Sequence, residues 1–185
     1  MPERVPAPKL PEFNERIVEQ LPTGPRPGHR THDLRASFSI DMWLRFDSLD
    51  EGQVVLDNRT EAGRGYALHT TRRGTLEIVL NDGRSESRWD CDPDLLTAGT
   101  LHHVAVIVDG GPKIVSFVVD GLLNDGGEHR QFGWGRFDPN FRNTPGTDTL
   151  TIGQDLKGVI ERLRIYDRYL RTSEAISSYR AGPGG

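Results

Sequence analysis

The chain has 185 residues, 35% of them hydrophobic and 8% aromatic, which is enough to pack the core of one domain of ordinary size. Its 27 acidic and 23 basic residues give a formal net charge of −4, so no basic excess exists to neutralise nucleic-acid phosphates or to hold an anionic membrane surface. A single cysteine, Cys91, excludes an internal disulfide framework, and no apolar run approaches the ~18 residues of a membrane span.

Residues 1–30 are expected to form a linker, because seven of the twelve prolines lie in this segment and proline removes a backbone donor. One element is embedded in it. Residues 13–21 (FNERIVEQL) carry apolar side chains every four positions, whereas residues 16–18 equally suit a short edge strand, which we favour. The N-terminus lacks the apolar core of a signal peptide, so we expect either a cytoplasmic protein or, preferably, a piece of a longer exported one.

Residues 38–46 (FSIDMWLRF) alternate strictly between apolar and mostly polar side chains, which predicts a strand with one buried face. Further strands are expected where short apolar runs recur between glycine-containing turns, at 52–57, 65–70, 75–80 and 84–89. The last two runs flank Asn81-Asp82-Gly83, a hairpin signal.

A second hairpin is predicted over 101–121, where two apolar runs flank Asp109-Gly110-Gly111-Pro112. We expect its glycines to supply positive φ and its proline to restart the chain in an extended conformation. After a long loop, strands are predicted at 149–153 and 159–167, and Thr172 or Ser173 could cap a final helical turn. Short strands at roughly ten-residue spacing predict an all-β fold of two antiparallel sheets, a sandwich or jelly roll.

The hairpin LHHVAVIVDGGPKIVSFVVDG (101–121) and the segment GVIERLRIYDRYLRTSEAI (158–176) resemble two motifs of known domains. These are the "WHHVAVVVDG…FYVDG" and "GxIDEVRIYDRALSxEEI" stretches of laminin-G-like, concanavalin A-like jelly rolls, which are often attached to bacterial glycosidases. The resemblance covers about residues 36–179 and implies a jelly-roll domain over 31–182. It also implies a non-catalytic carbohydrate-binding module of a larger bacterial enzyme, of the exo-glycosidase or sialidase type.

The loop at 124–141 carries the mixture of side chains that sugar recognition needs. Aromatic faces pack against ring C–H groups, while carboxylates, amides and guanidinium groups satisfy hydroxyls. The alternative is that the aromatic side chains plug one end of the sandwich. The ligand-binding residues that we expect in this loop are Trp134 and Arg130 above all, with Asp125, Glu128, Gln131 and Arg136.

The segment 87–94 (SRWDCDPD) is a second candidate, with Trp89 beside Asp90 and further acids at alternate positions. Alternating acids can converge on calcium, but the sixth and twelfth positions of an EF-hand loop are Leu95 and Leu101 here. Asx turns before Pro93 are the more ordinary interpretation. The alternative, functional interpretation is that Trp89 and Asp90 contact a sugar or a calcium ion.

Calcium is also considered because many laminin-G-like domains bind it. In the resembled strand an acidic pair follows the isoleucine, whereas this chain has Glu161-Arg162, which weakens that site. Asp57-Asn58 and Asp155 are other oxygen donors in predicted loops. We therefore expect no cofactor beyond a structural calcium ion, with its ligands unknown.

The histidines, the cysteine and the carboxylates do not form a recognisable catalytic or metal-binding motif in the sequence. His102 and His103 are adjacent in a strand and point to opposite faces, so they cannot chelate one ion. His29 and His32 have no partner ligands at suitable spacing, and Cys91 lies between acids that disfavour a thiolate. No Glu-x-Asp-x-Glu run exists for glycoside hydrolysis.

The sequence therefore predicts a protein that is not an enzyme, whose partners are a glycan and the other domains of its parent enzyme rather than nucleic acid or a membrane. We expect an extracellular or periplasmic location. A structural or protein-interaction domain that packs on its parent enzyme is the alternative, and a glycan-cleaving enzyme is a more distant one.

Overall fold

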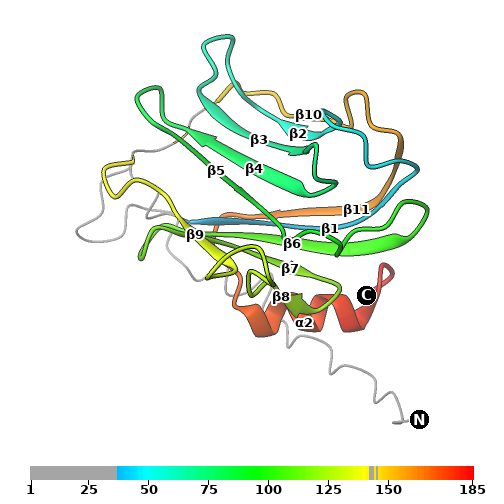
Figure 1. The fold of residues 1–185 in the computed structure, drawn as a ribbon. Coiled ribbons are helices and arrows are strands. Elements are labelled where there is room, and N and C mark those ends of the chain that lie inside the picture. The colour runs from blue at the N-terminus through cyan, green and yellow to red at the C-terminus, as the bar shows by residue number, and fades with distance from the viewer. Residues whose placement is uncertain (1–36, 142–143, 145) are drawn as a thin grey trace.

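The computed structural model describes residues 37–141, 144 and 146–185, so the predicted linker with its edge strand, and His29 and His32, lie outside the described residues. The described part contains eleven strands in two antiparallel sheets and the C-terminal helix α2 (Figure 1). The strands are β1 Phe38–Phe46, β2 Val54–Asp57, β3 Gly65–Thr70, β4 Leu76–Asn81, β5 Glu86–Asp90, β6 Leu101–Asp109, β7 Ile114–Val119, β8 Leu122–Leu123, β9 Trp134–Arg136, β10 Thr151–Ile152 and β11 Gly158–Tyr166. Helix α2 covers Thr172–Ala181.

One sheet has the strand order β11-β1-β6-β7-β8, with β9 also paired to β7, and the other has the order β10-β2-β3-β4-β5. Neighbouring strands that are far apart in sequence, such as β1 and β11, show that the chain crosses between the sheets. This confirms the predicted two-sheet antiparallel jelly roll. The predicted strands at 38–46 and 65–70 have the bounds of β1 and β3, and the other predicted strands overlap observed ones.

The core lies between the sheets, and β1 shows how the sequence fills it. Its apolar residues Ile40, Met42 and Leu44 are fully buried there. The opposite face of β1 is buried as well, with Asp41 at 0% exposure and Trp43 at 7%, because helix α2 covers it. The prediction of a half-buried strand was therefore wrong, since alternation along one strand does not show whether a distant helix covers the polar face.

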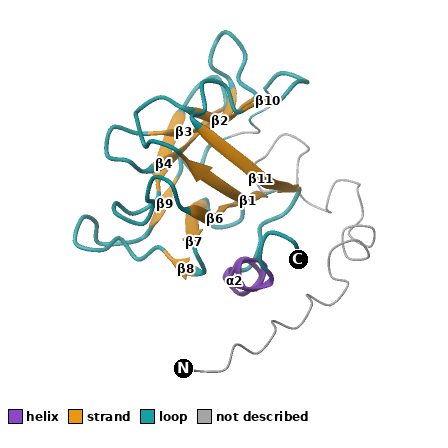
Figure 2. Cartoon of the chain, turned by 90° about the vertical axis from the view of Figure 1, so that its right-hand side faces the viewer, coloured by secondary structure: helices purple, strands orange, loops and turns teal. Residues whose placement is uncertain are grey.

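Helix α2 packs on the face of the six-stranded sheet that points away from the other sheet (Figures 1 and 2). Ser178 Oγ donates to Asp41 Oδ1 over 3.1 Å, and the indole of Trp43 stacks on the ring of Tyr179 with a centroid distance of 5.8 Å. The predicted caps Thr172 and Ser173 are wrong: both residues lie inside a ten-residue helix. Its first turn is stabilised by the Glu174 carboxylate, which accepts from the Arg171 amide over 2.7 Å.

The turn of the second hairpin also differs from its prediction. Asp109 pairs with Ile114, so four residues form the loop, and the residue with positive φ is Lys113, at 63°, rather than either glycine. The Asp109 carboxylate accepts from the Gly111 amide over 3.0 Å. This bond holds the start of the turn, and the left-handed residue falls at its end, where the chain re-enters the sheet.

The predicted long loop after Gly121 contains two short strands that the sequence did not indicate. Both pair with the same edge of β7. Leu123 of β8 lies opposite Val118 of β7, and Trp134 of β9 lies opposite Ser116 of β7. Strands of two or three residues are too short to show an alternating pattern. They nevertheless fix where this loop presents its side chains.

Candidate functional site

The structure separates the eight predicted ligand residues into two groups. Arg130, Trp89 and Asp90 meet in a partly buried cluster at the side of the sandwich where β5 faces β9. The other five lie on the surface of the loop and of β9, with all of them exposed except the half-buried Trp134. These five are Asp125, Glu128, Gln131, Trp134 and Arg136.

Arg130 acts as a strut between the loop and the five-stranded sheet. Its Nη1 lies 3.1 Å from Asp90 Oδ1 and its Nη2 lies 2.6 Å from Asp92 Oδ1. Nη2 also donates to the Asp90 carbonyl oxygen over 3.0 Å. Its guanidinium carbon lies 4.3 Å from the Trp89 ring centroid, a cation–π geometry. The two terminal nitrogens of Arg130 are thus engaged within the protein.

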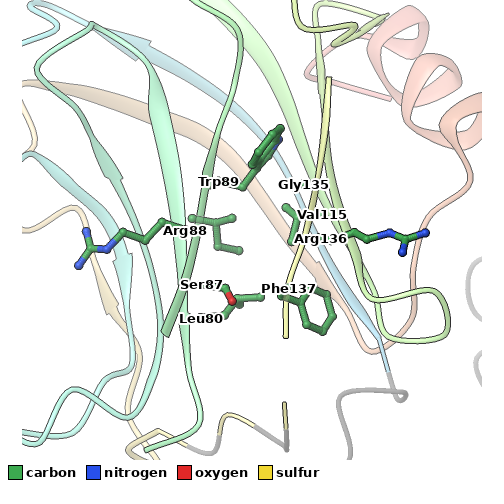
Figure 3. Close-up of a pocket in the computed structure, with 9 residues that line it drawn as sticks. Leu80, Ser87, Arg88, Trp89, Val115, Gly135, Arg136 and Phe137 are labelled. Atoms are coloured by element: carbon green, nitrogen blue, oxygen red, sulfur yellow. The ribbon is translucent and has the colours of Figure 1, made fainter. Parts of the chain in front are cut away.

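Trp89 fills the space between the two sheets at this side. Figure 3 shows it with Phe137 beside a narrow crevice between β5 and β9, while Arg88 and Arg136 point away from the crevice in opposite directions. The crevice has a volume of about 10 Å³, room for about one water molecule. It is too small for a sugar ring, so Trp89 faces no ligand-sized space here.

The aromatic side chains of the loop serve both predicted roles. Phe137 and Phe141 are 2% exposed and close one end of the core, packed edge to face at 5.8 Å. Phe132 is 48% exposed and stacks on Trp134 with a centroid distance of 5.0 Å. The plug and an outward aromatic surface are thus made by different residues of one loop.

A larger depression lies on the outer face of the five-stranded sheet, away from the loop. We call it the charged groove. Its volume is about 430 Å³, within the usual size range of ligand sites. It is lined by Glu51, Gly52, His69, Thr70, Thr71, Arg72, Arg73, Glu77, Arg88 and Asp90. Among the predicted ligand residues, Asp90 alone lines it.

Three neighbouring strands position the groove's central side chains. His69 on β3 lies opposite Glu77 on β4, and Glu77 lies opposite Asp90 on β5. His69 Nε2 is 3.2 Å from Glu77 Oε1, and Arg88 Nη1 is 3.2 Å from the same oxygen. The hydrogen bond from His69, aided by Arg88, holds the pKa of the Glu77 carboxyl below its usual value despite partial burial.

The Asp90 side chain is held from both sides. Its Oδ2 accepts from Arg73 Nη2 and from Thr75 Oγ1, each over 2.6 Å. Its Oδ1 faces Arg130 at 3.1 Å. Asp90 therefore connects the groove to the Arg130 strut, and the groove's polar groups are ordered before any ligand binds.

The sequence reasoning missed the groove, although a signal was present. His69, Glu77 and Arg88 are outward residues of three consecutive strands. The strand pairing places His69 opposite Glu77, and Arg88, which lies opposite Val79, reaches Glu77 diagonally. On its own strand Glu77 is a lone carboxylate, which by itself indicates no site. The missing step was the pairing of the strands, which sets the cross-strand neighbours.

The remaining candidates have structural partners. His102 Nδ1 lies 2.6 Å from Asp120 Oδ2, and His103 Nε2 lies 3.0 Å from Asp41 Oδ2, so the two imidazoles serve different carboxylates. Burial raises the pKa of the Cys91 thiol to about 12, and Cys91 Sγ accepts from the Leu76 amide over 3.2 Å.

The calcium candidates do not converge. Asp57 forms an ion pair with Arg59 at 2.6 Å, and the Asn58 side-chain oxygen accepts from the Tyr66 amide over 2.8 Å. Asp155 occupies a turn with φ of 56°. Within residues 37–141, 144 and 146–185 no group of three or more His, Cys, Asp or Glu side chains could hold a metal ion. Structural calcium remains a prediction without a described ligand set.

A two-sheet antiparallel jelly roll is an architecture that lectin domains share with other classes of protein. The chain belongs to the concanavalin A-like lectin/glucanases superfamily, whose laminin G family model matches residues 26–177. A comparison with curated proteins gave no match. No helix in the part of the chain that the structure describes is long and apolar enough to cross a membrane.

Several solved structures share this fold at low sequence identity. The CBM40 domain of the Ruminococcus gnavus IT-sialidase, bound to α2,3-sialyllactose, is 19% identical over 76% of this chain and 81% of that chain, with a TM-score of 0.58. The leech intramolecular trans-sialidase is 16% identical over 78% of this chain and 23% of its own, with a TM-score of 0.58. The binding domain of botulinum neurotoxin serotype D is 13% identical over 80% and 38%, with a TM-score of 0.59.

Proposed function

We propose that this chain is a non-catalytic carbohydrate-binding module of a larger bacterial glycan-active enzyme, of the exo-glycosidase or sialidase type. The charged groove carries the proposal, because it is a preformed depression of about 430 Å³ on a rigid sheet. Its walls offer guanidinium and imidazole donors beside carboxylate acceptors, which suits a ligand rich in hydroxyl groups. The likeness to a sialidase-attached CBM40 domain supports this proposal.

The proposed mechanism is binding alone. Arg72, Arg73 and Arg88 give the groove three guanidinium groups, of which Arg72 has no hydrogen bond or ion pair with any other described residue. A sugar that displaces water from these groups gains hydrogen bonds without reordering the strands. A module of this kind raises the effective concentration of its parent enzyme at a glycan, and even a weak site is useful for that purpose.

Two of the three carboxylates that line the groove lie on neighbouring strands, and their partners explain why we propose no catalysis. Glu77 and Asp90 face each other across β4 and β5, an arrangement that invites comparison with the acid and nucleophile of a glycosidase. A general acid needs a raised pKa, whereas the pKa of Glu77 is lowered by His69. Asp90 is committed to Arg73, Thr75 and Arg130. The Glu77 carboxyl is therefore poorly suited to donate a proton to a leaving oxygen, and the Asp90 side chain is already occupied by three partners within the protein.

The parent enzyme and the location follow from the same proposal. A module that concentrates an enzyme at an external glycan works outside the cytoplasm, so we place it in an exported protein with other domains. Mass spectrometry of the native protein from a secreted or periplasmic fraction would test this. A native protein found only in the cytoplasm would contradict it.

The binding proposal is tested by isothermal titration calorimetry and affinity electrophoresis of the full chain against a panel of neutral, acidic and sialylated oligosaccharides, including 3′-sialyllactose. We expect one or more to bind, and Arg88→Ala to weaken that binding by about tenfold or more, since one lost charged hydrogen bond is worth about 1.5 to 3 kcal/mol. Arg180→Ala is the matched control, because Arg180 is exposed in the last turn of α2, away from the groove. No binding across the panel would overturn the proposal.

One observation favours the alternative of a protein-interaction domain that packs on its parent enzyme. Leu122 and Leu123 on β8 are 64% and 49% exposed at the edge of the six-stranded sheet. Such a domain would show no rise in melting temperature with any saccharide of the panel. It would also lose its association with the parent enzyme when both leucines are changed to serine.

A further inference from the structure

The charged groove leaves the outward aromatic side chains of the loop, Phe132 and Trp134, without a role. Trp134 lies opposite Ser116, so its side chain is on the outer face of the six-stranded sheet, whereas the groove lies on the outer face of the five-stranded sheet. Figure 3 shows the same separation, with Arg88 and Arg136 pointing to opposite sides of the molecule. Any ligand of Trp134 is therefore a different ligand, or a different part of one, from that in the groove.

The sequence Gly133-Trp134-Gly135 constrains the backbone that carries the indole. A Cβ atom at Gly133 would collide with the backbone of Asn124, and one at Gly135 would collide with the indole of Trp89. Both glycines are thus required for β9 to lie this close to its neighbours, and β9 is also paired to β7. Trp134 is presented by a clamped backbone, so little conformational entropy would be lost when a ligand binds.

Phe132 stacks on this indole and leaves part of its own ring exposed. The two rings are stacked at 5.0 Å with an interplanar angle of 28°, and Phe132 is 48% exposed. Polar side chains are available nearby in the chain. The Arg136 guanidinium lies 5.7 Å from the Trp134 ring centroid, and Gln131, which is exposed, directly precedes Phe132. Neither the Arg136 nor the Gln131 side chain has a hydrogen bond or ion pair to another described residue.

We propose that Phe132 and Trp134, with Gln131 and Arg136, form a second sugar subsite, which we call the aromatic platform, for a neutral hexopyranose residue. The apolar C–H face of such a ring packs on the exposed Phe132 ring, and Gln131 and Arg136 donate to its hydroxyl groups. This inference rests on the proposed function and adds a second binding surface on the opposite face, which makes the domain bivalent.

The size of the surface favours a sugar over a protein. Each aromatic side chain can bury about 150 to 250 Å², so two half-covered rings fall well short of the roughly 800 Å² per partner of a stable protein interface. A single pyranose ring matches them in area. The exposed leucines of β8 lie along the same edge of β7 as β9 does. They could add apolar area for a protein partner, so the test includes binding of a protein as one of its outcomes.

The test uses the indole N–H signals of the ¹⁵N-labelled chain during titration with lactose. The chain has three tryptophans, and Trp→Phe variants assign their signals. We expect the chemical shift of the Trp134 indole N–H to change with lactose concentration and to reach a plateau. The chemical shift of Trp43, which is buried beneath α2, should stay constant. Phe132→Tyr keeps the ring and should bind like the wild type, whereas Phe132→Leu, which is apolar but not flat, should bind about tenfold more weakly.

The outcomes separate this inference from the proposed function. If Arg88→Ala abolishes glycan binding at the groove while lactose never moves the Trp134 signal, the platform is overturned and the proposed function stands. If Phe132→Leu binds lactose as well as the wild type does, ring stacking is refuted and the surface is left for a protein partner. If no saccharide of the panel acts on either surface, the proposed function fails as well. Circular dichroism and urea midpoints confirm that each variant is folded.

Discussion

Arg130 Nη2 lies 2.6 Å from Asp92 Oδ1, and this ion pair ties the loop that follows β8 to the segment that follows β5. The Asp92 side chain also accepts from the Gly126 amide over 2.9 Å, so the loop is held at two points. Both charged side chains are largely buried, at 17% and 8% exposure. The contact holds in place a loop that has few regular hydrogen bonds of its own.

Arg130→Ala should therefore destabilise the fold rather than only remove a ligand contact. The change leaves the buried carboxylates of Asp90 and Asp92 without their shared cation and uncovers one face of Trp89. We expect the free energy of unfolding to fall by about 3 kcal/mol, measured by urea denaturation. Arg130→Lys keeps the charge but loses the forked geometry, so its free energy of unfolding should lie between those of the wild type and Arg130→Ala. A stable Arg130→Ala variant that no longer binds sugar would instead support a direct ligand role.

Ser178 offers a test of how helix α2 is attached. Its hydroxyl donates to the buried Asp41 carboxylate over 3.1 Å, and the same carboxylate faces His103 Nε2 at 3.0 Å. Ser178→Ala should cost about 1 to 2 kcal/mol and speed amide hydrogen exchange in α2 more than in the strands. The neighbouring Ser177→Ala is the control, because the Ser177 hydroxyl bonds only within the helix, to the Ser173 carbonyl. Equal effects of the two changes would contradict this account.

Glu77 should contribute to the pH dependence of stability. The hydrogen bond from His69 lowers its pKa below the ordinary 4.5, so the folded state binds its proton less readily than the unfolded state does. The resulting stabilisation is fully present above pH 4.5 and is lost as the pH falls through the folded pKa. Glu77→Gln should flatten this acid limb when unfolding is followed by urea denaturation across that range. An unchanged pH profile would show that the ion pairs of the groove do not form in solution.

Cys91 should be chemically silent in the folded protein. Its burial raises the thiol pKa to about 12, and the neighbouring Asp90 and Asp92 disfavour a thiolate further. We expect no reaction with Ellman's reagent at about pH 8 in buffer, and one thiol per chain after unfolding in guanidinium chloride. Rapid labelling of the native protein would mean that this edge of the sandwich opens readily.

Some of this protein could be predicted from single strands taken one at a time. The alternation in residues 38–46 predicts β1 with its observed bounds, because a period of two follows from the strand backbone itself, and the short run at 65–70 between glycine-containing turns predicts β3. The His102-His103 pair was assigned to opposite sides of a strand by the same rule, and each imidazole has its own carboxylate. The two C-terminal motifs identified the superfamily for a related reason, since they carry the pattern of a complete hairpin and closing strand.

Local sequence alone predicted the longer strands, their apolar faces and, through the C-terminal motifs, the two-sheet jelly roll, but not the short strands β8 and β9 or the conformation of the turn after Asp109. The tertiary structure determined which side chains from different strands, loops and the helix contact one another. It placed helix α2 over the polar face of β1, directed Arg130 to Asp90 and Asp92, and brought His69, Glu77 and Arg88 from three strands into one groove. The physical reason is that cross-strand and helix-to-sheet neighbours are set by pairing and packing over long sequence separations, and hydrogen bonds and ion pairs depend on distances that no periodicity in one strand encodes.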